Sequence, residues 1–164
     1  STRDPTLFPY TTLFRSEKLY LPAHLAGQRM AMESCKYAKA LAAWRKRIRD
    51  MWGQVSIQKV ESSITNSVLH VNDVLTLNIE ASLGHLTPDD VVVEVLCGSL
   101  NSRGELENHV LYQTDFVGPV RDDVYSFKVD IHCHESGRHG YVVRIRPFHP
   151  DLIRNFSIEY VTWG

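Results

Sequence analysis

Long apolar runs, an excess of one charge sign and a large complement of cysteines are all missing from this 164-residue chain. No uninterrupted apolar stretch reaches the length of a membrane-spanning helix, and the first residues lack the pattern of a secretory signal. Eighteen basic residues nearly balance nineteen acidic ones, which gives no overall attraction to nucleic acid. Three cysteines are too few for a disulfide scaffold. We therefore expect a soluble, cytoplasmic globular protein without a membrane partner.

The charge is distributed unevenly along the chain. Residues 17–52 carry eight basic and three acidic side chains, whereas residues 53–164 carry eight basic and fifteen acidic ones. The hydrophobic period changes at the same boundary, so we predict a helical part over 17–52 and a β domain over 53–164. Residues 1–16 follow neither period and contain two prolines. They resemble a translated sequencing adapter, and we interpret them as a non-native or disordered tail.

Residues 22–52 have the pattern of one long amphipathic α-helix. Pro22 suits a first helical turn, and Gly53 suits the position after the last one. Six apolar side chains recur at steps that place them on one helix face. They are Met30, Tyr37, Leu41, Trp44, Ile48 and Met51. We expect this face to be exposed in the isolated chain and to dock on a partner.

A basic cluster ends the predicted helix and consists of Arg45, Lys46, Arg47 and Arg49. Such a cluster can bind nucleic acid, but no aromatic ladder and no nucleic-acid-binding motif accompanies it. The neighbouring Ile48 belongs to the apolar face, so the four cations form the solvated side of the helix. We therefore expect no nucleic-acid partner, and we expect this helix end to dock on an acidic or phosphate-rich surface, which can be another part of the same protein.

From Gln54 onward the hydrophobic period is two. Five alternating runs are separated by turn signals, and shorter runs lie at 55–60 and 157–163. The five runs cover 74–83, 91–97, 110–116, 125–133 and 141–146, and the turn signals lie at 87–90, 101–104, 118–119 and 136–137. About seven short strands with one apolar face each predict a mainly β fold. The expected architecture is an immunoglobulin-like antiparallel β-sandwich preceded by the long helix.

The densest group of potential metal ligands is formed by His132, His134 and His139. Strand alternation places the first two on one face, and a hairpin at 136–137 can bring the third near them. Three imidazoles can bind zinc, so a zinc-dependent hydrolase is one interpretation. We favour the other, an exposed histidine-rich hairpin without a metal.

Nothing else in the sequence predicts a catalytic residue. There is no G-x-S-x-G elbow, no phosphate-binding loop and no G-x-G-x-x-G motif. Cys97 and Cys133 fall on predicted core faces. They could pair across the sandwich, as in immunoglobulin domains, but without a secretory signal we favour two buried free thiols.

Five motifs in the same order resemble the end of bacterial α-glucan (glycogen/starch) phosphorylases, which form glycosyltransferase family 35. They are Glu17-Lys18-Leu19-Tyr20-Leu21-Pro22-Ala23, Ala42-Ala43-Trp44-Arg45 with Trp52, Gly84-His85-Leu86-Thr87-Pro88-Asp89-Asp90-Val91, Ser136 to Arg144 with Pro147, and Thr162-Trp163-Gly164. The similarity extends over 17–164.

The resemblance implies a C-terminal fragment of such an enzyme. The parent would use pyridoxal phosphate and inorganic phosphate to cleave terminal α-1,4-glucosidic bonds, releasing glucose 1-phosphate. The lysine of an S-N-M-K-type motif, which holds the cofactor in the family, has no counterpart in this sequence. We therefore expect the fragment to hold no cofactor and to be inactive alone. Its expected partners are the missing upstream catalytic domains and an α-glucan.

A free-standing module that binds carbohydrate or protein is the alternative. Such a domain has no need of an exposed aromatic helix face, so the state of that helix in the isolated chain discriminates between the two interpretations.

Overall fold

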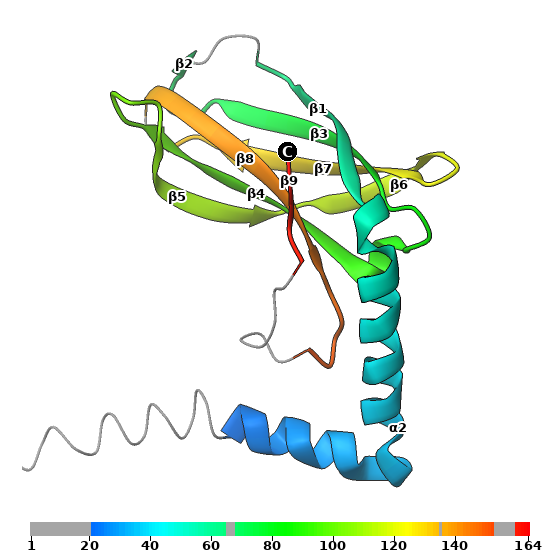
Figure 1. Ribbon diagram of the computed structural model, residues 1–164. Coiled ribbons are helices and arrows are strands. Elements are labelled where there is room, and N and C mark those ends of the chain that lie inside the picture. The colour runs from blue at the N-terminus through cyan, green and yellow to red at the C-terminus, as the bar shows by residue number, and fades with distance from the viewer. Residues whose placement is uncertain (1–20, 65–67, 135, 153–159) are drawn as a thin grey trace, which may run out of the picture. The chain divides into compact units, whose positions relative to one another are not determined.

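The computed structural model describes residues 21–64, 68–134, 136–152 and 160–164 (Figure 1). These residues fall into two compact units, one made of 21–46 with 150–152 and the other of 47–149 with 160–164. The interpretation of 1–16 as a tail lies outside the described residues. A search of the described helices finds none that is long and apolar enough to cross a membrane.

Within the described residues, the α-helix α2 (Leu21–Met51) precedes the strands and is followed by the short 3₁₀ helix η2 (Trp52–Gln54). The predicted helix is therefore confirmed to within one residue at each end. Cys35 has a φ of 63°, in the left-handed region that L-residues rarely occupy. Because this conformation departs from right-handed helical geometry, the residues before and after Cys35 do not share one continuous face.

The apolar helix face is less exposed than the sequence suggests. Trp44 and Ile48 are buried, and Tyr37, Leu41 and Met51 are half-buried. The side chain of Met30 lies outside the described part of the structure. The expectation of a fully exposed stripe is therefore wrong for Trp44 and Ile48. Ile48 belongs to the compact unit that contains the strands, so this end of the helix is part of that unit's core.

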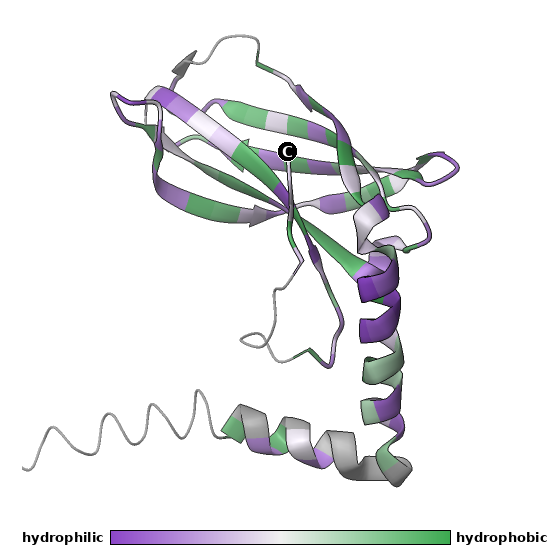
Figure 2. Ribbon diagram, in the orientation of Figure 1, coloured by the Kyte–Doolittle hydropathy of each residue, from purple (hydrophilic) through white to green (hydrophobic). Residues whose placement is uncertain are grey.

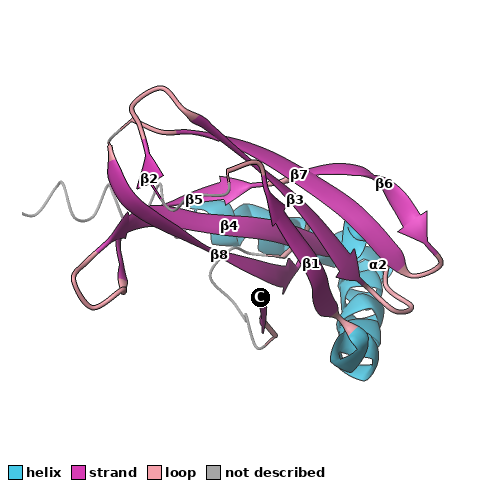
Figure 3. Ribbon diagram, turned by 90° about the horizontal axis from the view of Figure 1, so that it is seen from above, coloured by secondary structure: helices cyan, strands magenta, loops and turns pink. Residues whose placement is uncertain are grey.

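The strands form two antiparallel sheets that enclose the core (Figures 1 and 3). The four-stranded sheet has the order β1 (Ser56–Ser62), β3 (Val74–Ser82), β7 (Val124–His132) and β6 (Asp115–Arg121). The five-stranded sheet has the order β2 (Val68–Leu69), β8 (Gly137–Pro147), β4 (Val91–Leu100) and β5 (Leu106–Gln113), with β9 (Thr162–Trp163) beside β8. The predicted mainly β, two-sheet architecture after one helix is confirmed.

Alternating apolar residues of the central strands fill the space between the sheets. Figure 2 shows this alternation as hydrophobic and hydrophilic bands along β3 and β7. The largest fully buried side chains are Leu77, Ile79, Leu83, Leu86, Val93, Val95, Ile131, Val143 and Ile145. Burial of these side chains is the main favourable contribution to folding of the sandwich.

The sequence prediction fails where the chain passes from one sheet to the other. The run 110–116 was expected to form one strand, with a turn at 118–119, but β5 ends at Gln113 and β6 runs from Asp115 to Arg121. Thr114 lies between them and donates hydrogen bonds from N and Oγ1 to Val93 O, at 3.1 and 3.0 Å. Strand β6 accommodates its glycine and proline through two shifts in its register with β7, which are typical of bulges at a sheet edge.

The last strand closes one side of the sandwich. Strand β9 pairs with β8 and also contacts β1 of the other sheet. At the end of the chain, Gly164 N donates to Val143 O at 3.0 Å, and a Cβ on Gly164 would lie 2.7 Å from Ile57 Cδ1. The two sheets are therefore bridged on this side, whereas β5 and β6 are the terminal strands on the other.

Candidate functional site

The end of α2 is fixed to the sandwich through a buried carboxylate. Asp90 ends the 3₁₀ helix η3 (Pro88–Asp90) and forms a capping box with Thr87, accepting hydrogen bonds from Thr87 N at 3.0 Å and Thr87 Oγ1 at 2.8 Å. Its other carboxylate oxygen forms an ion pair with Arg47. Of the four basic residues at the helix end, Arg47 therefore pairs with an acidic side chain of this chain.

A glycine allows the turn after β3 to approach the end of the helix closely. Gly84 has a φ of 58°, which favours glycine. A Cβ at this position would lie 2.3 Å from Gln54 Oε1 and 2.6 Å from Gln54 Cβ. Both the backbone conformation and the available space therefore require glycine at the start of the Gly84-to-Val91 motif.

A second buried carboxylate, Glu94, lies on the outer face of the five-stranded sheet. Its neighbours Val93 and Val95 point into the core, so alternation directs Glu94 outward, yet only 4% of its surface is exposed. Arg144 and Arg146 of β8 cover it. Glu94 Oε2 accepts from Arg144 Nε and from Arg146 Nε, both at 2.7 Å, and Glu94 Oε1 pairs with Arg146 Nη2.

These contacts hold Glu94 in its charged form. Burial raises the pKa of Glu94, but hydrogen bonds from Arg146 and Arg144 outweigh burial and place the pKa below its ordinary value. The hydrogen bond to Glu94 in turn raises the pKa of Arg146. A carboxylate that is committed to two arginines joins β4 to β8 and is not available as a general base.

Arg144 also contacts the last strand, β9. Arg144 lies directly opposite Trp163 in the pairing of β8 with β9, and its guanidinium carbon lies 5.8 Å from the centre of the indole ring. This distance is within the range of a cation–π contact. Trp163 nevertheless keeps 56% of its surface exposed, so part of the ring is open to solvent.

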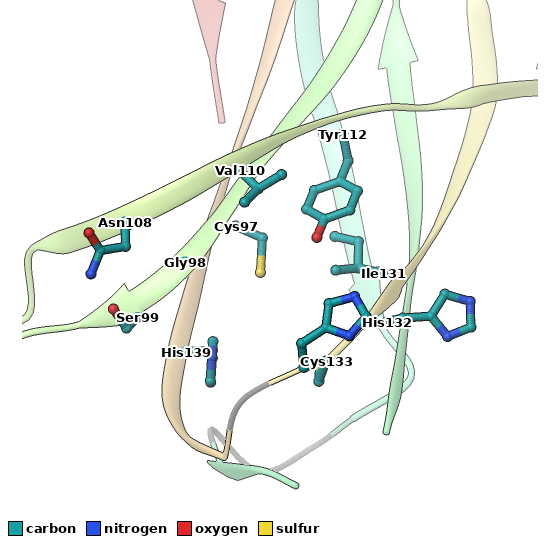
Figure 4. A pocket seen from close by; sticks show the side chains of 11 residues that line it. Cys97, Gly98, Ser99, Asn108, Val110, Tyr112, Ile131, His132, Cys133 and His139 are labelled. Atoms are coloured by element: carbon teal, nitrogen blue, oxygen red, sulfur yellow. The ribbon is translucent and has the colours of Figure 1, made fainter. Parts of the chain in front are cut away.

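A cavity of about 320 Å³ opens between the sheets at the end of β7. Figure 4 shows Cys97 of β4 and Tyr112 of β5 facing it from one sheet, with Ile131 and Cys133 on the other side. Cys97 and Cys133 are both buried and free, as we favoured from the sequence. The side chains that line the cavity therefore include two thiols, a phenol and the apolar Val110 and Ile131.

The two thiols and the phenol of this cavity favour their neutral forms. Burial raises the pKa of the Cys97 thiol, with a smaller contribution from Cys133. Burial also raises the pKa of Cys133 and of the Tyr112 phenol. The thiolate is the nucleophilic form of cysteine, so these thiols lack the environment of a reactive cysteine.

The structure brings the three candidate histidines to the rim of the same cavity. His132 and His134 are exposed, and His139 is half-buried with Nδ1 3.2 Å from Gly137 O. Within the described ranges, no three His, Cys, Asp or Glu side chains are grouped closely enough to hold a metal ion. The hairpin thus gathers the imidazoles around one opening without bringing them to a common point.

Sequence reasoning missed the role of Glu94 and did not identify the partner of Arg47. The Thr87-to-Asp90 capping box has a recognisable local signature, but its partner Arg47 is 43 residues away in the chain. Glu94 alternates with buried valines and reads as a solvated position. Only the pairing of β4 with β8 places Arg144 opposite Glu94 and Arg146 beside it.

The fold and these contacts define an antiparallel β-sandwich domain that is joined to the end of a helix by an ion pair. Within this class the chain belongs to the glycogen phosphorylase C-terminal domain family, whose family model matches residues 52–164.

Similarity to curated proteins extends beyond the matched domain. The chain is 28% identical over 146 residues to the glycogen phosphorylase of Mycobacterium bovis, which covers 89% of this chain and 17% of that protein. It is 27% identical to the glycogen phosphorylase of Mycobacterium tuberculosis, with the same coverage. It is 21% identical to the maltodextrin phosphorylase of Thermococcus litoralis over 90% of this chain and 17% of that protein. The chain therefore spans about one sixth of the length of these relatives.

Among solved structures, a DNA-bound alkylpurine DNA glycosylase from Pseudomonas fluorescens matches with a TM-score of 0.43 and 12% identity, over 88% of this chain and 46% of that one. A score this low does not establish a shared fold.

Proposed function

We propose that this chain is the non-catalytic C-terminal portion of a cytoplasmic α-glucan phosphorylase. Enzymes of this class use inorganic phosphate to release glucose 1-phosphate from α-1,4-linked glucan ends. The family match and the curated phosphorylases support this proposal. The observation that carries it is the structural role of three residues from the family-like motifs. Asp90, Arg144 and Trp163 hold elements of the fold together, and none of them lines the cavity.

The described residues do not fit pyridoxal phosphate. This cofactor needs a lysine for its Schiff base inside a pocket that also binds its phosphate. The described lysines are exposed or half-exposed and are Lys36, Lys39, Lys46, Lys59 and Lys128. None of the described residues that line the cavity is a lysine or an arginine. We therefore place the cofactor site in the upstream part of the parent enzyme.

We also place a contact with the upstream domains on α2. Trp44 and Ile48 are already buried in this chain. We therefore assign the contact to the half-exposed side chains of Tyr37 and Leu41, which precede them on the helix. In this proposal α2 connects the catalytic part of the parent to the sandwich.

The decisive experiment extends the reading frame upstream of Glu17 in the source DNA. The complete polypeptide and the present chain are then expressed separately and assayed for glucose 1-phosphate release from glycogen and inorganic phosphate. We expect activity that depends on pyridoxal phosphate from the complete polypeptide and none from the present chain. The proposal is overturned if no phosphorylase frame precedes Glu17, or if the present chain is active alone.

Binding of glucan by the sandwich is a separate part of the proposal. The exposed portion of the Trp163 ring supports it, because sugars bind to open aromatic faces. Titration of maltoheptaose into this chain should give binding heat at millimolar sugar, and Trp163→Leu should abolish it. If no heat is observed, the glucan part falls and the assignment as a phosphorylase C-terminal portion stands.

A further inference from the structure

The side of the sandwich formed by β5 and β6 exposes apolar side chains in an unusual concentration. The two strands follow each other with only Thr114 between them, and both are terminal strands of their sheets. Five large apolar residues of this segment are about half exposed or more. They are Val110, Leu111, Phe116, Val117 and Val120, and we refer to them as the open edge.

Two residues of the open edge belong to the core side of their sheets. Val110 lies directly opposite Cys97, and Phe116 lies directly opposite Phe127. Directly opposed residues of antiparallel strands point to the same face. Cys97 and Phe127 are 7% and 4% exposed, whereas Val110 and Phe116 are 53% and 52% exposed. The core is therefore uncovered at this margin, although the Phe116 ring still contacts Phe127 at a centroid distance of 5.8 Å.

The opposite margin of the same sandwich is covered. There β9 pairs with β8 and contacts β1, so a segment of this chain bridges the two sheets. Among the residues that the structure describes, no strand pairs with the free side of β5 or β6. Exposed apolar side chains that gather along one margin of a globular domain are typical of an interaction site.

The geometry of β6 argues against a second copy that adds to this edge as a strand. Strand addition needs a regular row of free backbone donors and acceptors. Pro119 has no N–H, and the register of β6 shifts at 116–118 and again at 119–121. Val117, the most exposed of the five residues at 61%, lies within the first shift. This edge is therefore suited to side-chain packing against a folded surface.

We propose that the open edge is the docking surface for the upstream part of the same polypeptide. The inference rests on the proposed function and deepens it. The relatives that cover this chain are about six times as long as the matched part, so a large folded body is available in the same polypeptide. The charged residues of the segment 105–123 are mostly acidic, with Glu105, Glu107, Asp115, Asp122 and Asp123 against Arg121. The five residues of the open edge are themselves apolar, and an intramolecular partner can maintain an apolar contact without electrostatic steering.

Photo-crosslinking in the complete polypeptide tests this proposal. A photo-crosslinking amino acid is placed at position 117, which is exposed and outside the regular pairing of β6. The matched control has it at position 71, because Val71 is 51% exposed in the turn between β2 and β3. We expect position 117 to give a crosslink within one polypeptide to residues upstream of Glu17, in several-fold excess over position 71.

Three results overturn the inference. They are a crosslink between two copies, equal yields at the two positions, and no crosslink from position 117. The first result identifies a second copy as the occupant, and the other two show an uncovered edge. Phosphorolysis by the same preparation is measured in parallel. An active enzyme without the intramolecular crosslink refutes only the docking surface, whereas the lack of an upstream phosphorylase frame refutes the proposed function as well.

A second variant reads out the same surface in the isolated chain. Val117→Asp should reduce the binding of an environment-sensitive hydrophobic dye several-fold, whereas Val71→Asp should leave it unchanged. The side chain of Val117 is too exposed for its loss to unfold the sandwich, and circular dichroism checks this. Equal dye binding by both variants contradicts an apolar surface centred on the open edge.

Discussion

Replacement of Glu94 by glutamine tests whether the buried carboxylate holds β4 and β8 together through its charge. Glu94→Gln keeps the size of the side chain but removes its charge. The two arginine nitrogens that donate to Glu94 Oε2 at 2.7 Å then share one neutral acceptor, and the new amide group turns two donors toward other donors. Arg144 and Arg146 keep their own charges in a partly buried setting, with side-chain exposures of 22% and 23%.

The expected loss is large because one carboxylate serves two cations. Removing one partner of a buried ion pair costs about 3–5 kcal/mol, and the partial exposure of both arginines brings the expectation to the lower end, about 3 kcal/mol. With a urea dependence of roughly 2 kcal/mol per M, the unfolding midpoint at neutral pH should fall by about 1.5 M.

The pH dependence separates charge from packing. A carboxyl group whose folded pKa is lowered contributes stability above its unfolded pKa and loses that contribution as the pH falls through the folded value. The difference between wild type and Glu94→Gln should therefore be complete at neutral pH and shrink in acid, below the ordinary pKa of 4.5.

Urea titrations followed by circular dichroism at several pH values measure the effect. Glu61→Gln is the matched control, because Glu61 pairs with Lys59 at 2.7 Å but both side chains are more than half exposed. We expect no measurable change there. Equal midpoints for wild type and Glu94→Gln at neutral pH, or a difference that persists undiminished in acid, would refute the reasoning.

Two further predictions concern the turns and the thiols. Gly84→Ala should cost about 1–3 kcal/mol of stability in thermal unfolding, because a left-handed backbone and a collision with a glutamine side chain act together. Gly104→Ala should cost about 1 kcal/mol, because its φ is 78° but no atom lies within 4 Å of the added Cβ, and equal losses would contradict the collision. An aromatic disulfide reagent should modify the exposed Cys35 rapidly in the native chain, and Cys97 and Cys133 only after unfolding, because burial raises the pKa of both thiols. Three equally fast phases would contradict that assignment.

The features that the sequence predicts well depend on local pattern. The ends of α2 follow from Pro22 and Gly53, and β3 and β7 follow from an apolar residue at every second position. Each signal acts within a few residues and needs no knowledge of the partner strand. The two-sheet architecture follows from the number and spacing of such runs, whereas the immunoglobulin-like classification stays a prediction.

The features that the sequence does not predict depend on distant partners. Thr114 looks like one more residue of a β run, and only its two hydrogen bonds to Val93 reveal that the chain changes sheets there. Gly118 and Pro119 have the local signal of a turn. In the structure they belong to β6, which pairs with β7 as an edge strand with two register shifts. Cys35 has no local signal at all for its left-handed conformation.

The candidate site divides in the same way. The capping box at Thr87–Asp90 is local, whereas the roles of Arg47 and Glu94 exist only after folding. Clustering of the histidines was predicted from their spacing, and the structure places all three at one cavity. The docking role of the helix face is still a prediction that the complete polypeptide must test.

The ion pair between Arg47 and Asp90 lies across the boundary of the region that the family model matches. The family match begins at Trp52, but the compact unit begins at Arg47 and includes the buried Ile48. A fragment that starts at Trp52 would lack the last turn of α2. It would remove a cation from a buried carboxylate and an apolar side chain from the core. The region matched by the family model is thus shorter than the compact unit, and excision, fusion or transfer of this domain has to respect the physical boundary.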